Sequence, residues 1–130
     1  MNALTVFIAD DETPARERLR ELLSDIAQEI PTRVVGEARN GLEAVALVPE
    51  SGARIVLLDI HMPGLGGLEV ARHLARLPQP PAVVFVTAHD RHAVEAFELN
   101  ALDYLLKPVR AERLAAALRK AMAAGPTAAE

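Results

Sequence analysis

Apolar runs of strand length alternate along the chain with segments whose apolar residues recur at helical spacing. The strand-like runs lie at residues 4–9, 33–38, 54–58, 82–86 and 104–106. A helix-like segment follows each run, and the first of these carries Leu19, Leu22, Leu23 and Ile26 on one stripe. Three of the runs are almost wholly apolar, which is typical of parallel strands covered on both faces. The pattern predicts an α/β fold with a doubly wound parallel sheet.

A few residues predict where the helices begin and end. Thr13 is expected to cap the first helix, and Asn40 with Glu43 forms the N-x-x-E pattern of a capping box at the second. Pro49 is expected to break that second helix, because proline removes a backbone donor. Asp90 is the expected cap of the fourth helix.

Composition narrows the class of protein. The chain has 130 residues, of which 51% are apolar and 25% are charged, which suits one globular domain. Aromatic residues make up only 3%, so the core must be aliphatic. Cysteine is absent, which excludes disulfides, thiolate catalysis and cysteine-based zinc sites.

Charge and hydropathy bear on partners and location. The formal net charge of −4 gives this chain no basic surface for nucleic acid. No apolar run approaches the length of a membrane span, and the first residues do not resemble a signal peptide. We therefore expect a cytoplasmic protein without a membrane partner.

Polar residues directly follow four of the predicted strands. Asp10 and Asp11 follow the first strand, Asp59 the third, Thr87 the fourth and Lys107 the fifth. The carboxyl ends of parallel strands lie at one edge of a sheet, so we expect these side chains to converge. Three clustered carboxylates repel one another unless a proton or cation intervenes, and such hard oxygen donors suit Mg²⁺.

Asp59 is the best candidate nucleophile of this group, because it ends a central strand and precedes a Gly- and Pro-rich loop. A carboxylate can attack phosphorus to give an aspartyl phosphate. Lys107 and Thr87 would stabilise the oxygens of the phosphoryl group during transfer. An enzyme that uses Asp59 as a nucleophile, such as a small-molecule phosphatase, remains an alternative, although no predicted connection is long enough to form a substrate cap.

Four segments resemble the receiver domains of bacterial two-component response regulators. They are Ile-Ala-Asp-Asp-Glu at 8–12, Val-Leu-Leu-Asp-Ile-His-Met-Pro-Gly at 56–64, Val-Thr-Ala at 86–88 and Tyr-Leu-Leu-Lys-Pro at 104–108. The resemblance extends from residue 5 to about 123. It implies a flavodoxin-like fold of five helices and five parallel strands in the order 2-1-3-4-5. The receiver would then occupy residues 1–124, and residues 125–130 would begin a linker or tail.

The resemblance also implies roles for the residues that bind metal and phosphate. Asp59 would be the phosphoacceptor for a sensor histidine kinase. Asp11 would ligate Mg²⁺ directly, Asp10 mainly through water, and His61 through its backbone carbonyl. Such a domain is not an enzyme, beyond slow hydrolysis of its own phosphate. A pseudo-receiver that never accepts phosphate is disfavoured by the complete acidic set.

Further implied roles concern the response to phosphorylation. Thr87 and Lys107 would bind the phosphoryl group, and Tyr104 would be a switch whose rotamer follows Thr87. The bond from Lys107 to Pro108 would be cis. His61 and His89 stand at positions that tune phosphate lifetime in this family, although both could equally be ordinary loop residues.

Residues 89–104 resemble a narrower group, the LytTR class, which includes regulators of alginate biosynthesis. In that class a DNA-binding domain follows the receiver and controls transcription, and it is absent from these 130 residues. Phosphorylation would drive homodimerisation through the fourth helix, fifth strand and fifth helix, with Val94, Phe97, Leu105 and Val109 as contacts. The alternative is a stand-alone receiver that acts by docking to a partner protein.

Overall fold

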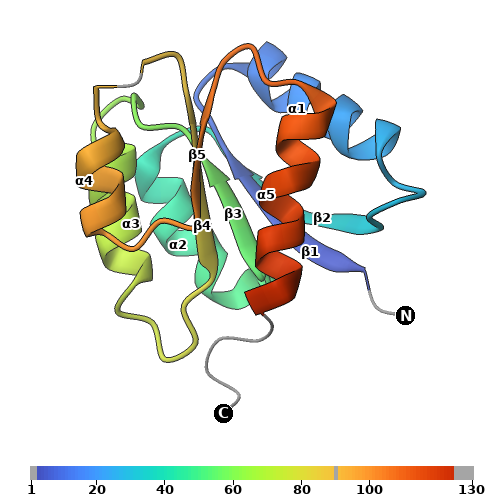
Figure 1. Cartoon of the computed structure of the whole chain (residues 1–130). Coiled ribbons are helices and arrows are strands. Elements are labelled where there is room, and N and C mark those ends of the chain that lie inside the picture. Colours follow the sequence, from blue (N-terminus) through green and yellow to red (C-terminus); the bar gives the residue numbers. More distant parts are fainter. Residues whose placement is uncertain (1–2, 90, 125–130) are drawn as a thin grey trace.

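The computed structural model describes residues 3–89 and 91–124. Within them, strands and helices alternate along the whole length (Figure 1). The elements in order are β1 (Leu4–Ala9), α1 (Thr13–Asp25), β2 (Thr32–Ala38), α2 (Gly41–Ser51), β3 (Ile55–Leu58), α3 (Gly67–Leu74), β4 (Ala82–Thr87), α4 (Ala93–Glu98), β5 (Asp103–Leu106) and α5 (Ala111–Ala124).

The sheet has five strands in the order β2-β1-β3-β4-β5, and every neighbouring pair is parallel. This confirms the predicted fold class and strand order. Helices α1 and α5 cover one face, whereas α2, α3 and α4 cover the other (Figure 1). Ala9 pairs with Leu58, and Leu58 pairs with Phe85. The carboxyl ends of β1, β3 and β4 are therefore aligned at one edge.

Alternating side chains of each strand form two hydrophobic layers, one on each face of the sheet. In β1, Val6 and Ile8 pack with α1 and α5, whereas Phe7 and Ala9 pack with α2 and α3. Gly36 on β2 allows the Phe7 ring to approach, because a Cβ atom there would lie 2.6 Å from the ring. The core is otherwise aliphatic, as the scarcity of aromatic residues predicts.

Two of the predicted helix boundaries are wrong. Thr13 lies inside α1 rather than capping it, and its hydroxyl accepts a hydrogen bond from Arg16 instead. Pro49 does not break α2, which continues to Ser51 and ends at Gly52 in the left-handed conformation. Pro49 is exposed in the last turn, where its missing N–H removes only one helical hydrogen bond.

The predicted cap of α2 is confirmed. Asn40 Oδ1 accepts a hydrogen bond of 2.9 Å from the backbone N–H of Glu43. The carboxylate of Glu43 accepts from the backbone N–H of Arg39, rather than from that of Asn40 as in a full capping box. The predicted cap of α4, Asp90, lies outside the described residues. No helix in the described ranges is long and apolar enough to cross a membrane.

Candidate functional site

The predicted acidic residues converge at the carboxyl edge of the sheet. Asp10, Asp11 and Asp59 each place a carboxylate oxygen within 4.8 Å of the others. Asp10 and Asp59 are buried, with 1% and 6% of their surfaces exposed, whereas Asp11 is exposed. Three negative charges so close together require a counter-charge.

One ammonium group enters this cluster from the residue that directly follows β5. Lys107 Nζ lies 2.9 Å from Asp10 Oδ2 and 3.4 Å from Asp59 Oδ2. Its backbone N–H donates to the Thr87 carbonyl, and its peptide bond to Pro108 is cis, the isomer that the resemblance implies. One cation thus contacts two of the three carboxylates, and the cluster retains a negative formal charge.

The pKa values reflect this imbalance. Burial raises the pKa of Asp59, and the Asp10 charge raises it further, although the Lys107 charge opposes both effects. Burial alone would lower the pKa of Lys107, but its hydrogen bond to Asp10 and the charges of Asp59 and Asp10 raise it instead. Lys107 therefore stays charged, but its positive charge neutralises only part of the negative charge on ionised Asp59.

Backbone contacts fix the Asp59 carboxylate in place. The Asp59 N–H donates to the Ala9 carbonyl on β1, and the His61 N–H donates to Asp59 Oδ1 at 3.3 Å. Gly67 begins α3 directly against this segment, because a Cβ atom there would lie 2.1 Å from the Asp59 carbonyl oxygen. Only glycine allows α3 to pack this closely behind the carboxylate.

Thr87 and Tyr104 flank the site on β4 and β5. Thr87 is fully buried, and its hydroxyl has no hydrogen-bond partner within the described residues. A buried hydroxyl without a partner is costly, so this oxygen is available to a ligand at the sheet edge. The Tyr104 hydroxyl donates to the His89 carbonyl at 2.6 Å, which connects β5 to the loop after β4.

Three histidines gather beside the acidic cluster. The His61 ring lies 5.3 Å from that of His89 and 5.3 Å from that of His92, measured between ring centroids. His92 Nδ1 also contacts Glu95 Oε1 at 3.0 Å. The first two were predicted near the site, whereas His92 was not. Its spacing of three residues from His89 was the available signal.

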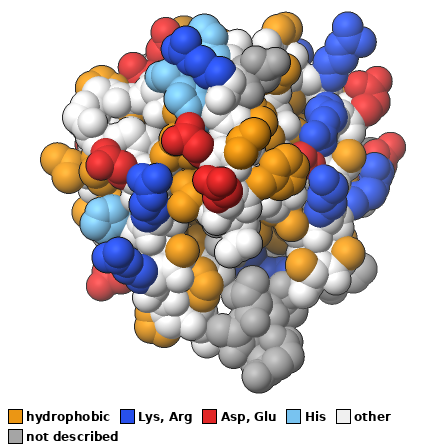
Figure 2. All heavy atoms as spheres, turned by 60° about the vertical axis from the view of Figure 1, so that its left-hand side comes forward, with side chains coloured by type: hydrophobic (Ala, Val, Ile, Leu, Met, Phe, Trp, Pro, Cys, Tyr) orange, Lys and Arg blue, Asp and Glu red, His pale blue; other side chains and the backbone are white. Residues whose placement is uncertain are grey.

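The predicted dimerisation surface needs correction. Val94 and Phe97 on α4 are 69% and 72% exposed, and Figure 2 shows hydrophobic side chains among acidic ones on the face that carries α4. Leu105 and Val109 are buried in the layer beneath α1 and α5, so they cannot contact a partner on this face. Alternation along β5 instead exposes Leu106, which is 47% exposed.

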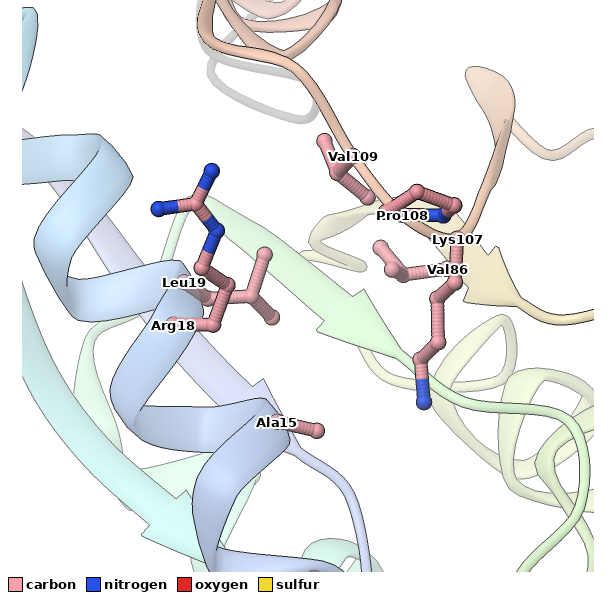
Figure 3. A pocket seen from close by; sticks show the side chains of 7 residues that line it. All are labelled: Ala15, Arg18, Leu19, Val86, Lys107, Pro108 and Val109. Atoms are coloured by element: carbon pink, nitrogen blue, oxygen red, sulfur yellow. The ribbon is translucent and has the colours of Figure 1, made fainter.

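An apolar hollow of about 130 Å³ lies between α1 and the loop after β5. Figure 3 shows Arg18 and Leu19 on α1 opposite Val86 and the segment 107–109. The hollow shares Lys107 with the acidic cluster but includes none of its carboxylates. The chemistry is therefore placed at the carboxylate cluster and not in this hollow.

The donor set of the cluster fits a magnesium ion. Its atoms are hard carboxylate oxygens, two from buried residues and one from the exposed Asp11. Mg²⁺ keeps several waters and binds through one or two carboxylates, which a partly open cluster of this kind permits. The Thr87 hydroxyl, which has no partner among the described residues, and the Lys107 ammonium suit the oxygens of a phosphoryl group.

Comparison with known proteins decides the family. Residues 6–119 match the model of the response regulator receiver domain. The chain belongs to this family. The solved response regulatory domain of mrkE from Klebsiella pneumoniae is 35% identical, with a TM-score of 0.82 over 92% of this chain and 96% of that one. The chain is thus a receiver domain of a two-component response regulator, a class of signalling proteins.

Relatives of known name place this receiver in the LytTR class. The positive alginate biosynthesis regulatory protein of Pseudomonas aeruginosa is 52% identical over 119 residues, which are 91% of this chain and 47% of that protein. The sensory transduction protein LytT of Bacillus cereus is 40% identical over 117 residues, which are 90% of this chain and 46% of that protein. These names confirm the narrower resemblance. The chain spans about half the length of the curated relatives it matches.

Proposed function

We propose that this receiver accepts a phosphoryl group on Asp59 from the phosphohistidine of a sensor kinase. The observation that supports it most is the position of Asp59, a buried carboxylate that shares one ammonium with Asp10 at the carboxyl edge of the sheet. The raised pKa of Asp59 shows that this carboxylate is under-compensated when ionised. Transfer of a phosphoryl group would use it as a nucleophile.

The transfer follows from the groups around Asp59. A carboxylate oxygen of Asp59 attacks phosphorus, a P–O bond forms, and the P–N bond breaks with its electron pair on the departing imidazole. The Lys107 ammonium neutralises phosphoryl oxygen charge, and the Thr87 hydroxyl donates a hydrogen bond. Asp10, Asp11, Asp59 and the His61 carbonyl would hold Mg²⁺, which supplies further positive charge when bound.

The phosphoryl group then alters the surface of the domain. Thr87, whose hydroxyl lacks a partner within the described residues, would turn toward phosphate, and Tyr104 would leave the His89 carbonyl and rotate inward. The surface formed by α4, β5 and α5 would change and bind a second copy. Among the described residues, the large exposed apolar side chains on these elements are Val94, Phe97, Leu106 and Met122.

The rest of the protein would convert this change into gene regulation. Because the chain spans about half of its relatives, we place a LytTR-type DNA-binding domain after the receiver, with residues 1–124 as the receiver and 125–130 as the start of the linker. Dimerisation would align two such domains on paired half-sites. The protein would act in the cytoplasm and have no catalytic turnover beyond slow self-dephosphorylation.

Intact-mass spectrometry tests this function. The purified domain is incubated with acetyl phosphate, with and without Mg²⁺, alongside the Asp59→Asn variant. We expect one added phosphoryl group only when both Mg²⁺ and Asp59 are present. An adduct that persists in Asp59→Asn would contradict the assignment. If no adduct forms, Mg²⁺-dependent binding of beryllofluoride distinguishes fast hydrolysis from an inactive site, and failure of both experiments refutes the proposal.

A further inference from the structure

We propose that Arg16 is a positioning residue that sets the metal affinity of the acidic cluster. Its guanidinium holds the peptide between Asp10 and Asp11, and so controls where the exposed Asp11 carboxylate lies. The inference rests on the proposed function, in which Asp10, Asp11 and Asp59 bind Mg²⁺. It assigns a role in that binding to a residue that would itself touch neither the metal nor the phosphoryl group.

The side chain of Arg16 is buried and bonds to three separate segments. The residue is 8% exposed, although arginine is rarely buried without a specific partner. Nη1 donates to the Asp10 carbonyl at 2.7 Å, Nη2 to Thr13 Oγ1 at 3.0 Å, and Nε to Glu37 Oε1 at 3.0 Å. One planar group therefore connects the loop after β1 with α1 and β2.

The rest of Asp10 is fixed by other groups. Its N–H donates to the Ala38 carbonyl at 3.1 Å, and its carboxylate accepts from the Glu12 N–H and from Lys107. Arg16 supplies the hydrogen bond to the carbonyl. Because that carbonyl lies in one rigid plane with the N–H of Asp11, this bond fixes the orientation of the next residue.

Asp11 depends on this backbone restraint. Its carboxylate is exposed and makes no hydrogen bond or ion pair within residues 3–89 and 91–124, whereas Asp10 and Asp59 share Lys107. The Asp11 side chain thus has no partner of its own in the described residues, and its position depends on the backbone on either side, which the Arg16 bond to the Asp10 carbonyl and the Glu12 N–H bond to the Asp10 carboxylate hold. Loss of the Arg16 bond would let this peptide rotate and move one of the three carboxylates away from the metal.

The role of Arg16 is geometric more than electrostatic. Glu37 accepts hydrogen bonds from both Arg16 and Arg20, so much of the Arg16 charge is neutralised nearby. Arg20 has a half-exposed side chain and no contact with Asp10, which makes it a matched control. A lysine at position 16 would retain the charge but could not bond to all three acceptors, because it lacks the fork of the guanidinium.

Binding of Mn²⁺, measured by electron paramagnetic resonance, tests the proposal directly. We expect Arg16→Met and Arg16→Lys to weaken Mn²⁺ binding by about tenfold, a loss typical of residues that orient metal ligands. Arg20→Met should bind Mn²⁺ as the wild type does. With acetyl phosphate, the Mg²⁺ concentration for half-maximal phosphorylation should rise in both Arg16 variants, while the rate at saturating Mg²⁺ stays close to the wild-type rate.

The outcomes separate this inference from the proposed function. Wild-type affinity in either Arg16 variant, or an equal loss in Arg20→Met, overturns the role of Arg16 even when the wild type is phosphorylated normally. If Arg16→Met does not fold, the Mn²⁺ affinity of Arg16→Lys alone tests the role of Arg16. We expect this variant to fold, because its ammonium can still pair with Glu37. A wild-type domain that binds no Mn²⁺ overturns the proposed function and with it this inference.

Discussion

Asp59 and Asp103 are both buried aspartates, yet their surroundings have opposite effects. They are 6% and 8% exposed, respectively. Asp59 shares one ammonium with Asp10, and its contact with that ammonium is 3.4 Å. Asp103 begins β5 and accepts two hydrogen bonds from Arg113, at 2.7 and 2.9 Å, and pairs with Lys120 at 3.1 Å.

The two carboxyl groups consequently differ in pKa. Burial dominates at Asp59 and raises its pKa. Burial acts in the same direction at Asp103, but the hydrogen bonds from Arg113, the Tyr104 N–H and Lys120 outweigh it and lower the pKa to about 2. Burial alone thus does not set the pKa of these aspartates; the number of cations that contact each carboxylate does. Asp59 still needs a further positive charge, whereas Asp103 is fully paired and stabilises the packing of α5 on β5.

Replacing the cation that contacts each aspartate should produce the largest difference between the two sites. We expect Lys107→Met to slow phosphorylation of Asp59 by about 10²–10³-fold, because a positive group near the transferring oxygens is lost. The equivalent change at the other site, Arg113→Met, should leave the phosphorylation rate nearly unchanged. Both rates are measured with acetyl phosphate at saturating Mg²⁺. Equal losses in the two variants would mean that Lys107 acts through stability alone.

Asp103→Asn should destabilise the fold in a pH-dependent way. The folded-state pKa of about 2 lies below the ordinary value of 3.8. Ionised Asp103 therefore contributes about 2 kcal/mol above pH 4, and this contribution is lost as the pH falls from about 4 to 2. Urea denaturation at pH 7 and pH 2 measures the difference from wild type. A destabilisation of the same size at both pH values would contradict an electrostatic origin.

Asp59→Asn should have the opposite effect on stability. Because the pKa of Asp59 is raised, its ionised form costs folding free energy above that pKa, and the cost disappears as the pH falls below the ordinary value of 3.8. We expect the variant to unfold at higher urea than the wild type at pH 7 without Mg²⁺. Added Mg²⁺ should stabilise the wild type and narrow the gap. A variant less stable than the wild type would show that neighbouring cations neutralise the charge of Asp59 as fully as they neutralise that of Asp103.

The smallest expected effect concerns the histidines beside Asp59. Replacing both His61 and His89 with Ala should speed loss of the phosphoryl group, because the rings limit the access of water. The change should stay below about tenfold, which is about 1.4 kcal/mol of barrier. Decay after removal of acetyl phosphate measures it, with His73→Ala on the exposed side of α3 as the control. An unchanged decay rate in the double variant refutes this role.

The sequence predicted those site residues whose positions are determined by the ends of strands. Asp10, Asp59, Thr87 and Lys107 each follow or end an apolar run, and parallel strands bring such positions to one edge. The alternation of apolar runs and helical segments also predicted the fold class, whereas the strand order came from the resemblance to receiver domains. Strand limits agree within about one residue, because the apolar runs end abruptly at polar residues.

The contacts of long charged side chains could not be predicted in this way. Arg16 resembles a solvated residue of α1, although its helical register with the buried Leu19 and Leu23 was an available signal. Asp103 and Arg113 also look like surface charges, because their pairing depends on how α5 packs on β5. Leu105 was assigned to the wrong face because a strand of four residues is too short for its alternation to be decisive.

Chemical trapping of the phosphorylated residue tests the central claim most directly. The domain is phosphorylated with acetyl phosphate and Mg²⁺, reduced with borohydride, which converts an aspartyl phosphate to homoserine, and mapped by peptide mass spectrometry. The account predicts homoserine at position 59 and at neither Asp10, Asp11 nor Asp103. Homoserine at any of those three positions, with Asp59 unmodified, would contradict it.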